Sequence, residues 1–153
     1  MKTFYFTLSW AIETHRLVIE QSGGVHGVKD RGLLESVLTH IQNDDYYPEF
    51  LDKLTHLCFA VNKLHAFHDG NKRASLALGA FFLLLNGYDH CVTPFLRDME
   101  NITVWVAENA IKKELLRDIL QDIILQAARE EVRLAIIHAT QHAHPDAQGG
   151  DHA

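Results

Sequence analysis

Residues 76–85 form an unbroken apolar segment, LALGAFFLLL, and this segment most constrains how the chain can fold. A helix that crosses a membrane needs roughly 20 apolar residues, so the segment is too short to span a bilayer. The polar sequence HAFHDGNKR precedes it, and Asn86-Gly87 follows, where glycine supplies the left-handed residue that often ends a helix. We therefore expect a helix from about Asn71 to residue 85 at the centre of the core, because it is apolar on nearly all sides.

Helical periodicity recurs along most of the 153 residues and predicts an all-α fold. Two segments, residues 25–29 and 88–92, are expected to be short and extended. The helix that begins at Phe50 is expected to end near Phe67, and the last helix is expected to be long. The predicted helices begin after Thr7, after Asp30, at Phe50, at Asn71, at Pro94 after the N-cap Thr93, and at Lys112.

Composition limits the classes of function. The formal net charge of −6 argues against a general attraction to phosphate backbones, so we expect no direct nucleic-acid binding. The N-terminal segment has polar interruptions and no small-residue cleavage site, which predicts a cytoplasmic protein. The two cysteines, Cys58 and Cys91, have apolar surroundings and are expected to be buried thiols of a reducing compartment. We expect no association with a membrane.

The chain has no internal repeat, so we expect one domain at residues 1–141 that includes a C-terminal helical extension. Residues 142–153 have no periodicity and are expected to form a flexible tail that contains histidines. His138 and His142 have the i, i+4 spacing of a transition-metal site, but no carboxylate or thiolate accompanies them in a fixed frame. A mobile tail is therefore the favoured interpretation.

The sequence HAFHDGNKR is a tight polar segment between the two most apolar predicted helices. Gly70 lets the backbone approach an anion at a helix N-terminus, and Lys72 and Arg73 add two cations there. His65 and Asp69 supply a base and a carboxylate able to hold Mg²⁺ beside phosphate oxygens. Each of these residues alone is more often structural, but together they favour a phosphate site.

These residues match a family pattern. HAFHDGNKR resembles the signature H-x-F-x-D/E-G/A-N-G/K-R of the Fic/Doc superfamily, and GGVHGVKDRGLLESVL and the NGY after the apolar segment are similar to other segments of that family. The resemblance covers residues 7 to about 110. It implies a helical bundle with a short β-hairpin flap, on which family members dock a target segment by strand pairing. The flap would comprise Val25, His26, Gly27, Val28 and Lys29.

The resemblance also implies roles for the motif residues. His65 would be the general base for an attacking hydroxyl, and Asp69 would hold Mg²⁺ on the nucleotide phosphates. Gly70, Asn71 and the following backbone N–H groups would form an anion nest, while Lys72 and Arg73 would neutralise phosphate charge. Phe67 would belong to the core. Lys63 aligns with a basic residue of some relatives, although a solvated lysine is an equal alternative.

Two positions distinguish the branches of this family. Nucleotidyl-transferring members have glycine where this chain has Lys72 and arginine where it has Leu76, whereas both residues here are of the Doc type. In the Doc branch the lysine is thought to reverse the bound nucleotide, so that the γ-phosphate of ATP is transferred. The resemblance thus implies a kinase-like phosphotransferase. The alternatives are an adenylyltransferase and a catalytically silent binding protein of the same fold.

The Doc branch implies partners as well. Its members are toxins of toxin-antitoxin modules, and the known target is translation elongation factor Tu, phosphorylated on a threonine. The family's inhibitory pattern S/T-x-x-x-E-G/N has no intact copy in this chain, because TVWVAEN has one residue too many. Inhibition is therefore expected from a separate antitoxin that inserts a segment near the active site.

Overall fold

A computed structural model describes the backbone of residues 2–151 and the side chains of residues 2–141. In that part of the chain all regular secondary structure is helical, which confirms the all-α prediction. The helices are α1 (Leu8–Ser22), α2 (Arg31–His40), α3 (Phe50–Lys63), α4 (Asn71–Leu85), α5 (Asp89–Ala107), α6 (Lys113–Leu125) and α7 (Glu130–Asp151).

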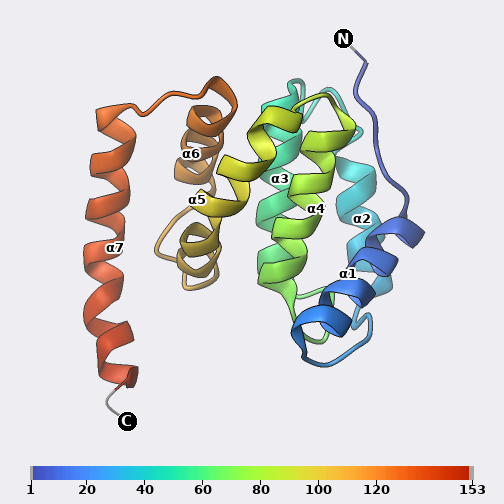
Figure 1. Cartoon of the computed structure of the whole chain (residues 1–153), viewed down its shortest axis with the longest axis horizontal. Coiled ribbons are helices and arrows are strands. Elements are labelled where there is room, and N and C mark those ends of the chain that lie inside the picture. The colour runs from blue at the N-terminus through green and yellow to red at the C-terminus, as the bar shows by residue number, and fades with distance from the viewer. Residues whose placement is uncertain (1, 152–153) are drawn as a thin grey trace.

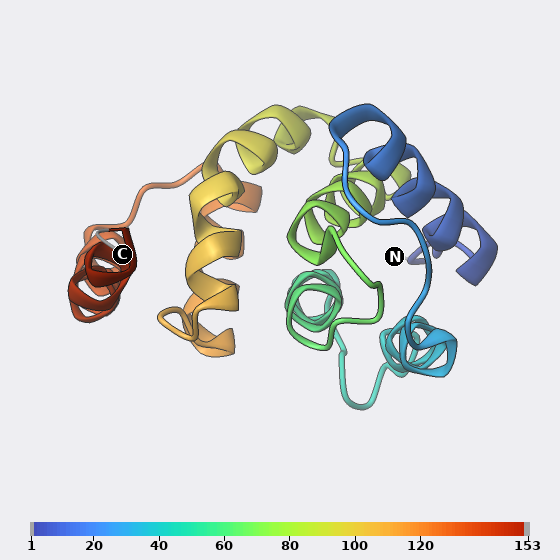
Figure 2. The ribbon, with the colours of Figure 1, turned by 90° about the horizontal axis from the view of Figure 1, so that it is seen from below.

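The helices α3 and α4 lie side by side at the centre, as Figure 1 shows, with α1 and α2 on one side and α5 and α6 on the other. The view from below in Figure 2 shows the same order and places α7 outside α6. The loop between α3 and α4 lies at the same end as the segment between α1 and α2 (Figure 1). This shared end brings the polar motif and the expected flap together.

The apolar segment of α4 is central, as predicted. Its residues Leu78, Phe82 and Leu83 are fully buried. Gly79 marks the closest approach of neighbouring helices, because a Cβ atom there would lie 2.7 Å from Cζ of Phe95 and 2.8 Å from Sγ of Cys58. Only a residue without a side chain permits this packing of α3, α4 and α5.

Helix-capping residues account for several predicted boundaries. The Thr7 hydroxyl oxygen accepts a hydrogen bond from the backbone N–H of Trp10 at 3.1 Å, at the start of α1. The Asp30 carboxylate accepts one from the N–H of Leu33 at 2.9 Å, at the start of α2. These bonds satisfy backbone donors that a helix leaves without intrahelical partners.

The prediction of an extended segment at residues 88–92 is wrong, because α5 already begins at Asp89 and contains Pro94. Cys91, Phe95 and Met99 are buried at intervals of four residues, a helical stripe that outweighs the missing hydrogen bond of the proline. In Figure 2 the helix changes direction along its length, which is the usual effect of an internal proline.

Two further boundaries differ from the prediction. The helix α3 ends at Lys63, about one turn before Phe67, because the backbone of His65 is left-handed with φ of 53°. The long last helix is interrupted at Gln126, where φ is 52°, and α7 then starts at Glu130. The backbone of residues 142–151 continues α7, and the side chains of the expected tail at 142–153 lie outside the described residues, so its flexibility stays a prediction.

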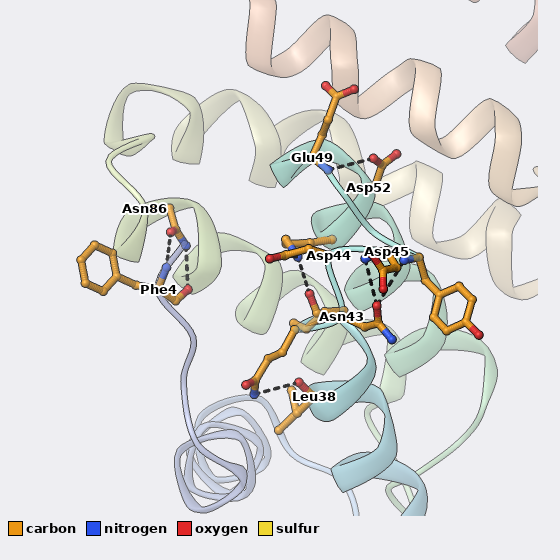
Figure 3. A network of polar contacts seen from close by, with 12 residues as sticks. Phe4, Leu38, Asn43, Asp44, Asp45, Glu49, Asp52 and Asn86 are labelled. Atoms are coloured by element: carbon orange, nitrogen blue, oxygen red, sulfur yellow. Dashed lines mark hydrogen bonds and ion pairs between the residues drawn. The ribbon is translucent and has the colours of Figure 1, made fainter. Parts of the chain in front are cut away.

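The end of the bundle opposite the motif is held by polar contacts, some of which Figure 3 shows. The Asn86 side chain accepts a hydrogen bond from the N–H of Phe4 at 2.8 Å and donates one to the backbone carbonyl of Phe4 at 3.0 Å. The Lys53 side chain, which is 1% exposed, donates to the carbonyl of Ile41 and to the carboxylate of Asp44. We call this region, comprising residues 41–53 and the Phe4 to Asn86 contact, the distal end.

Both Cys58 and Cys91 are buried free thiols, as expected, and burial raises the pKa of Cys58 to about 12. In the described residues, none of the helices combines the length and the apolar character that crossing a bilayer requires.

Candidate active site

The loop between α3 and α4 is shaped by Asn71, the first residue of α4. Its carboxamide oxygen accepts a hydrogen bond from the N–H of Phe67 at 3.1 Å, and its nitrogen donates to the Phe67 carbonyl at 3.0 Å. These two bonds fix the orientation of the amide, so its remaining N–H points toward Nδ1 of His65, 3.4 Å away. This long contact places the Asn71 amide beside the exposed ring of His65, and the roles of the two ring nitrogens depend on the tautomer.

Phe67 anchors the loop in the core, as predicted, with 1% of its surface exposed. Its ring stacks on the imidazole of His15 in α1, with 3.9 Å between the ring centroids. Nε2 of His15 lies 2.7 Å from the carbonyl oxygen of Asp69, which can only accept, so this nitrogen carries the proton. Burial lowers the pKa of His15 and favours its neutral form, against the opposite effect of the hydrogen bond to Asp69.

His15 was not among the site residues predicted from the sequence. It lies four residues after Ala11 and four before Ile19, and all three are buried on the inner face of α1. A histidine on an otherwise apolar helical face needs a hydrogen-bond partner when it is buried. That spacing was the available signal, but the partner in the motif loop is 54 residues away along the chain.

The carboxylate of Asp69 joins the loop to the segment after α1. One oxygen accepts a hydrogen bond from the N–H of Val25 at 3.0 Å, and the other accepts one from Gly70 at 2.8 Å. These two backbone donors, helped by nearby Arg73, lower the pKa of Asp69. The group is therefore a stable carboxylate at neutral pH, and each oxygen keeps lone pairs for a further ligand.

The expected flap does not form a β-hairpin in the described residues. Val28 instead makes an isolated antiparallel bridge with Phe67. The N–H of Lys29 donates to the carbonyl of Ala66 at 2.8 Å, and the N–H of His68 donates to the carbonyl of Gly27 at 3.1 Å. The segment 25–29 is too short to pair with itself, so it pairs with the motif loop and leaves its other edge open. We keep the name flap for residues 25–29.

Lys72 and Arg73 differ in how they are held. The guanidinium of Arg73 donates to the hydroxyl of Ser22 and, at 2.7 Å, to the carbonyl of Gly23, so it clamps the end of α1. The ammonium of Lys72 has neither a hydrogen bond nor an ion pair with any described residue, and its side chain is exposed. Lys72 is thus the cation that remains available to a ligand, while Arg73 also has a structural task.

Lys63 is engaged elsewhere. Its ammonium donates to the side chain of Asn109 and, at 3.4 Å, to the carbonyl of Ala107. These contacts join the end of α3 to the end of α5, so the structure supports neither the aligned functional role nor a fully solvated lysine.

One cavity of about 310 Å³ unites the predicted residues. That volume lies at the small end of the range for ligand pockets, roughly 300–1,000 Å³. None of the flap residues lines the cavity, and a larger cavity of about 880 Å³ between α5, α6 and α7 contains none of the motif residues. The 310 Å³ cavity, called the motif cavity below, is lined by Asn62, His65, His68, Asp69, Gly70, Asn71, Lys72, Arg73 and Ala107.

The donor set fits Mg²⁺ bound together with phosphate. Mg²⁺ in nucleotide sites is commonly held by one or two carboxylates, phosphate oxygens and water, and Asp69 supplies one such carboxylate at the motif cavity. No cluster of three histidine, cysteine or acidic side chains that could hold an ion occurs in the part of the chain whose side chains are described. An ion at Asp69 would therefore depend on the phosphates for its remaining ligands.

Comparison with known proteins agrees with this geometry. The sequence model described as the Fic/DOC family matches residues 5–83, which include the flap, the motif and most of α4. The chain belongs to the Fic/DOC family. The match includes every motif residue that lines the motif cavity.

Individual relatives of the family carry the Doc name. The chain is 32% identical over 114 residues to the protein kinase doc of Escherichia phage P1, and the match covers 72% of this chain and 87% of that protein. It is 38% identical over 69 residues to the toxin Doc of Mycolicibacterium smegmatis, covering 42% of this chain and 53% of that protein. The resemblance to the Doc branch is thereby confirmed.

Proposed function

We propose that this protein is a Doc-type toxin that transfers the γ-phosphoryl group of ATP to a hydroxyl group of a protein substrate in the cytoplasm. The observation that carries the proposal is the meeting of a base, a carboxylate and a free cation in one cavity. These are His65, Asp69 and Lys72, and the N-terminus of α4 lies among them. Phosphoryl transfer depends mainly on positioning and charge neutralisation, which such a set supplies.

The proposed reaction is a displacement at phosphorus. The substrate hydroxyl oxygen forms a bond to the γ-phosphorus, and the bond from that phosphorus to the bridging oxygen breaks, so ADP leaves. His65 takes the hydroxyl proton on its unprotonated ring nitrogen. The backbone N–H groups that begin α4 and the ammonium of Lys72 stabilise the phosphate oxygens. Mg²⁺ held by Asp69 would further neutralise phosphate charge.

Lys72 supports phosphoryl rather than nucleotidyl transfer. Its ammonium is free to contact phosphate and its stem occupies space at the start of α4 that glycine would leave open. Leu76 stands one turn later, where nucleotidyl-transferring relatives have an arginine, so the chain lacks that second phosphate ligand. The related phage protein is named a protein kinase, which agrees with this choice.

The flap is proposed as the docking edge for the substrate. In an antiparallel pair, a residue between two hydrogen-bonded neighbours points its own N–H and C=O away from the partner strand. Val28 has this position between Gly27 and Lys29, and its peptide groups have no partner in the described part of the chain. An extended substrate segment could pair there by strand addition.

The remaining partners follow from the Doc assignment. We propose translation elongation factor Tu as the substrate, and a cognate antitoxin that inserts a segment near the motif cavity as the inhibitor. The name of the mycobacterial relative, toxin Doc, supports a toxin-antitoxin setting.

Intact-mass spectrometry of elongation factor Tu, incubated with this protein, Mg²⁺ and ATP, tests the proposal. We expect a phosphoryl-sized increase that disappears with His65→Ala and persists with His68→Ala, an exposed histidine of the same loop. An AMP-sized increase would instead establish the adenylyltransferase alternative. No increase with the unmodified protein would contradict the proposed pairing of this substrate with this donor.

A further inference from the structure

Asn62 has a polar atom that the fold leaves unsatisfied. It lies in α3, three residues before His65, and is 2% exposed. Its side-chain nitrogen donates to the carbonyl of Thr103 in α5 at 2.9 Å, but its oxygen Oδ1 has no hydrogen-bond partner. Among the described residues, this is the one buried side-chain polar atom without a partner.

The orientation of the Asn62 amide is not interchangeable. A carbonyl oxygen such as that of Thr103 can only accept, so the amide nitrogen must face it and Oδ1 must face elsewhere. Buried polar atoms are nearly always hydrogen-bonded, because an unpaired one loses its water without compensation. An apolar side chain of similar size would avoid this loss, so packing alone does not account for an asparagine here.

The location of Asn62 indicates which group completes the hydrogen bond. The residue lines the motif cavity together with His65 and the phosphate-binding residues at the start of α4. Asn62 lines the cavity from α3 and Ala107 from the end of α5, whereas Asp69 and Gly70 belong to the loop before α4. The flap, where the protein substrate would dock, does not line this cavity. A nucleotide whose phosphates lie at α4 and whose nucleoside fills the part of the cavity between α3 and α5 would reach Asn62.

We propose that Oδ1 of Asn62 accepts a hydrogen bond from the nucleoside part of the bound nucleotide, either from a ribose hydroxyl or from the amino group of the base. This inference rests on the proposed function, because it requires a nucleotide in the motif cavity. It makes Asn62 a contact residue for the nucleotide, in addition to the motif HAFHDGNKR. Both candidate groups offer the same chemistry, a donor to an amide oxygen.

Calorimetric titration in Mg²⁺, without protein substrate, tests the contact. The ligands are ATP, 2′-deoxy-ATP, 3′-deoxy-ATP and the analogue that lacks the 6-amino group. The proteins are the unmodified chain and Asn62→Leu, which removes the acceptor and keeps side-chain volume. We expect one analogue to bind the unmodified chain about 2- to 10-fold more weakly than ATP, the usual range for one hydrogen bond, and to bind Asn62→Leu as ATP does.

The identity of the affected analogue distinguishes a ribose hydroxyl from the base amino group. If the affinity for each analogue, relative to that for ATP, is the same in both proteins, Asn62 has only a packing role and the inference is wrong. If the unmodified chain binds ATP but shows no such coupling, the inference fails while the proposed function stands. If it binds no nucleotide at all, the proposed function fails as well. Asn62→Ala, checked by thermal unfolding, replaces Asn62→Leu if the latter does not fold.

Discussion

Lys53 and Lys72 lie near opposite ends of the antiparallel pair α3 and α4, and the fold treats them differently. At the distal end, Lys53 is buried and donates to a carbonyl and a carboxylate. At the motif end, Lys72 is exposed and has no partner among the described residues. Histidines repeat the contrast, because His56 is half-buried with two polar neighbours while His65 is exposed with one long contact. The distal end uses its polar groups for stability, and the motif end leaves them for a ligand.

Lys72→Met should give the largest effect, and it should fall on transfer alone. Removing a preorganised charge from a phosphate site costs about 10²- to 10³-fold in rate. The free energy of unfolding should change by less than about 0.5 kcal/mol, because the side chain is exposed and unpaired. Initial rates of phosphate incorporation and urea unfolding of the same preparation measure the two quantities. A large loss of stability would mean that Lys72, like Lys53, stabilises the fold.

Lowering the pH should destabilise the protein through His56. Burial, then the ammonium of Lys113, lowers the pKa of His56 to about 4 from about 6.5. In the unfolded chain His56 is protonated below about pH 6.5, but in the folded chain it is protonated only below about pH 4. The free energy of unfolding therefore falls as the pH is lowered from 6.5 to 4. A pKa shift of this size corresponds to a full loss of at most about 3 kcal/mol, because solvent screens the half-buried ring.

Urea unfolding at several pH values between 7 and 4 measures this dependence. His56→Gln should unfold with a flatter pH dependence, although it is less stable at pH 7. Burial also lowers the pKa of His15, so His15 contributes in the same direction. The free energy of unfolding of the variant should therefore still depend on pH, but less steeply. Equal slopes for the variant and the parent would mean that His56 is not the group that titrates.

Lys53→Met should lower the free energy of unfolding by about 2 kcal/mol and leave phosphate transfer unchanged. The variant keeps the apolar stem but leaves the carbonyl of Ile41 without its buried donor. Thermal unfolding together with the transfer assay separates the two effects. A loss of transfer that exceeds the loss of folded protein would argue that the two ends are coupled.

Asn86→Ala should give the smallest effect, about 1 kcal/mol of stability. It removes both hydrogen bonds that tie Phe4 to the end of α4, and these are exposed to solvent. Limited proteolysis should then cut the N-terminal segment faster, with transfer unaffected. An unchanged cleavage rate would mean that aromatic packing of Tyr5 and Phe6 against Phe82 already holds this segment.

Local signals predicted what is local in this fold. The caps at Thr7 and Asp30, the central position of α4 and the gathering of His65, Asp69 and Lys72 all followed from short stretches of sequence. Contacts between distant segments were not predictable in the same way. The pairing of Val28 with Phe67 and the unpaired oxygen of Asn62 depend on how helices meet. The interrupted last helix was missed because glycine usually occupies a left-handed helix end, and a glutamine such as Gln126 gives no signal of one.

Three segments converge on Phe67: its ring stacks on α1, its backbone is bracketed by Asn71 of α4, and its neighbours pair with the flap. The nine-residue motif therefore depends on the surrounding fold for its geometry. Transplanted between two helices of another protein, it would keep its reactive side chains but lose the supports that set their positions. Engineering this chemistry elsewhere would require moving α1, the flap and both central helices as one unit.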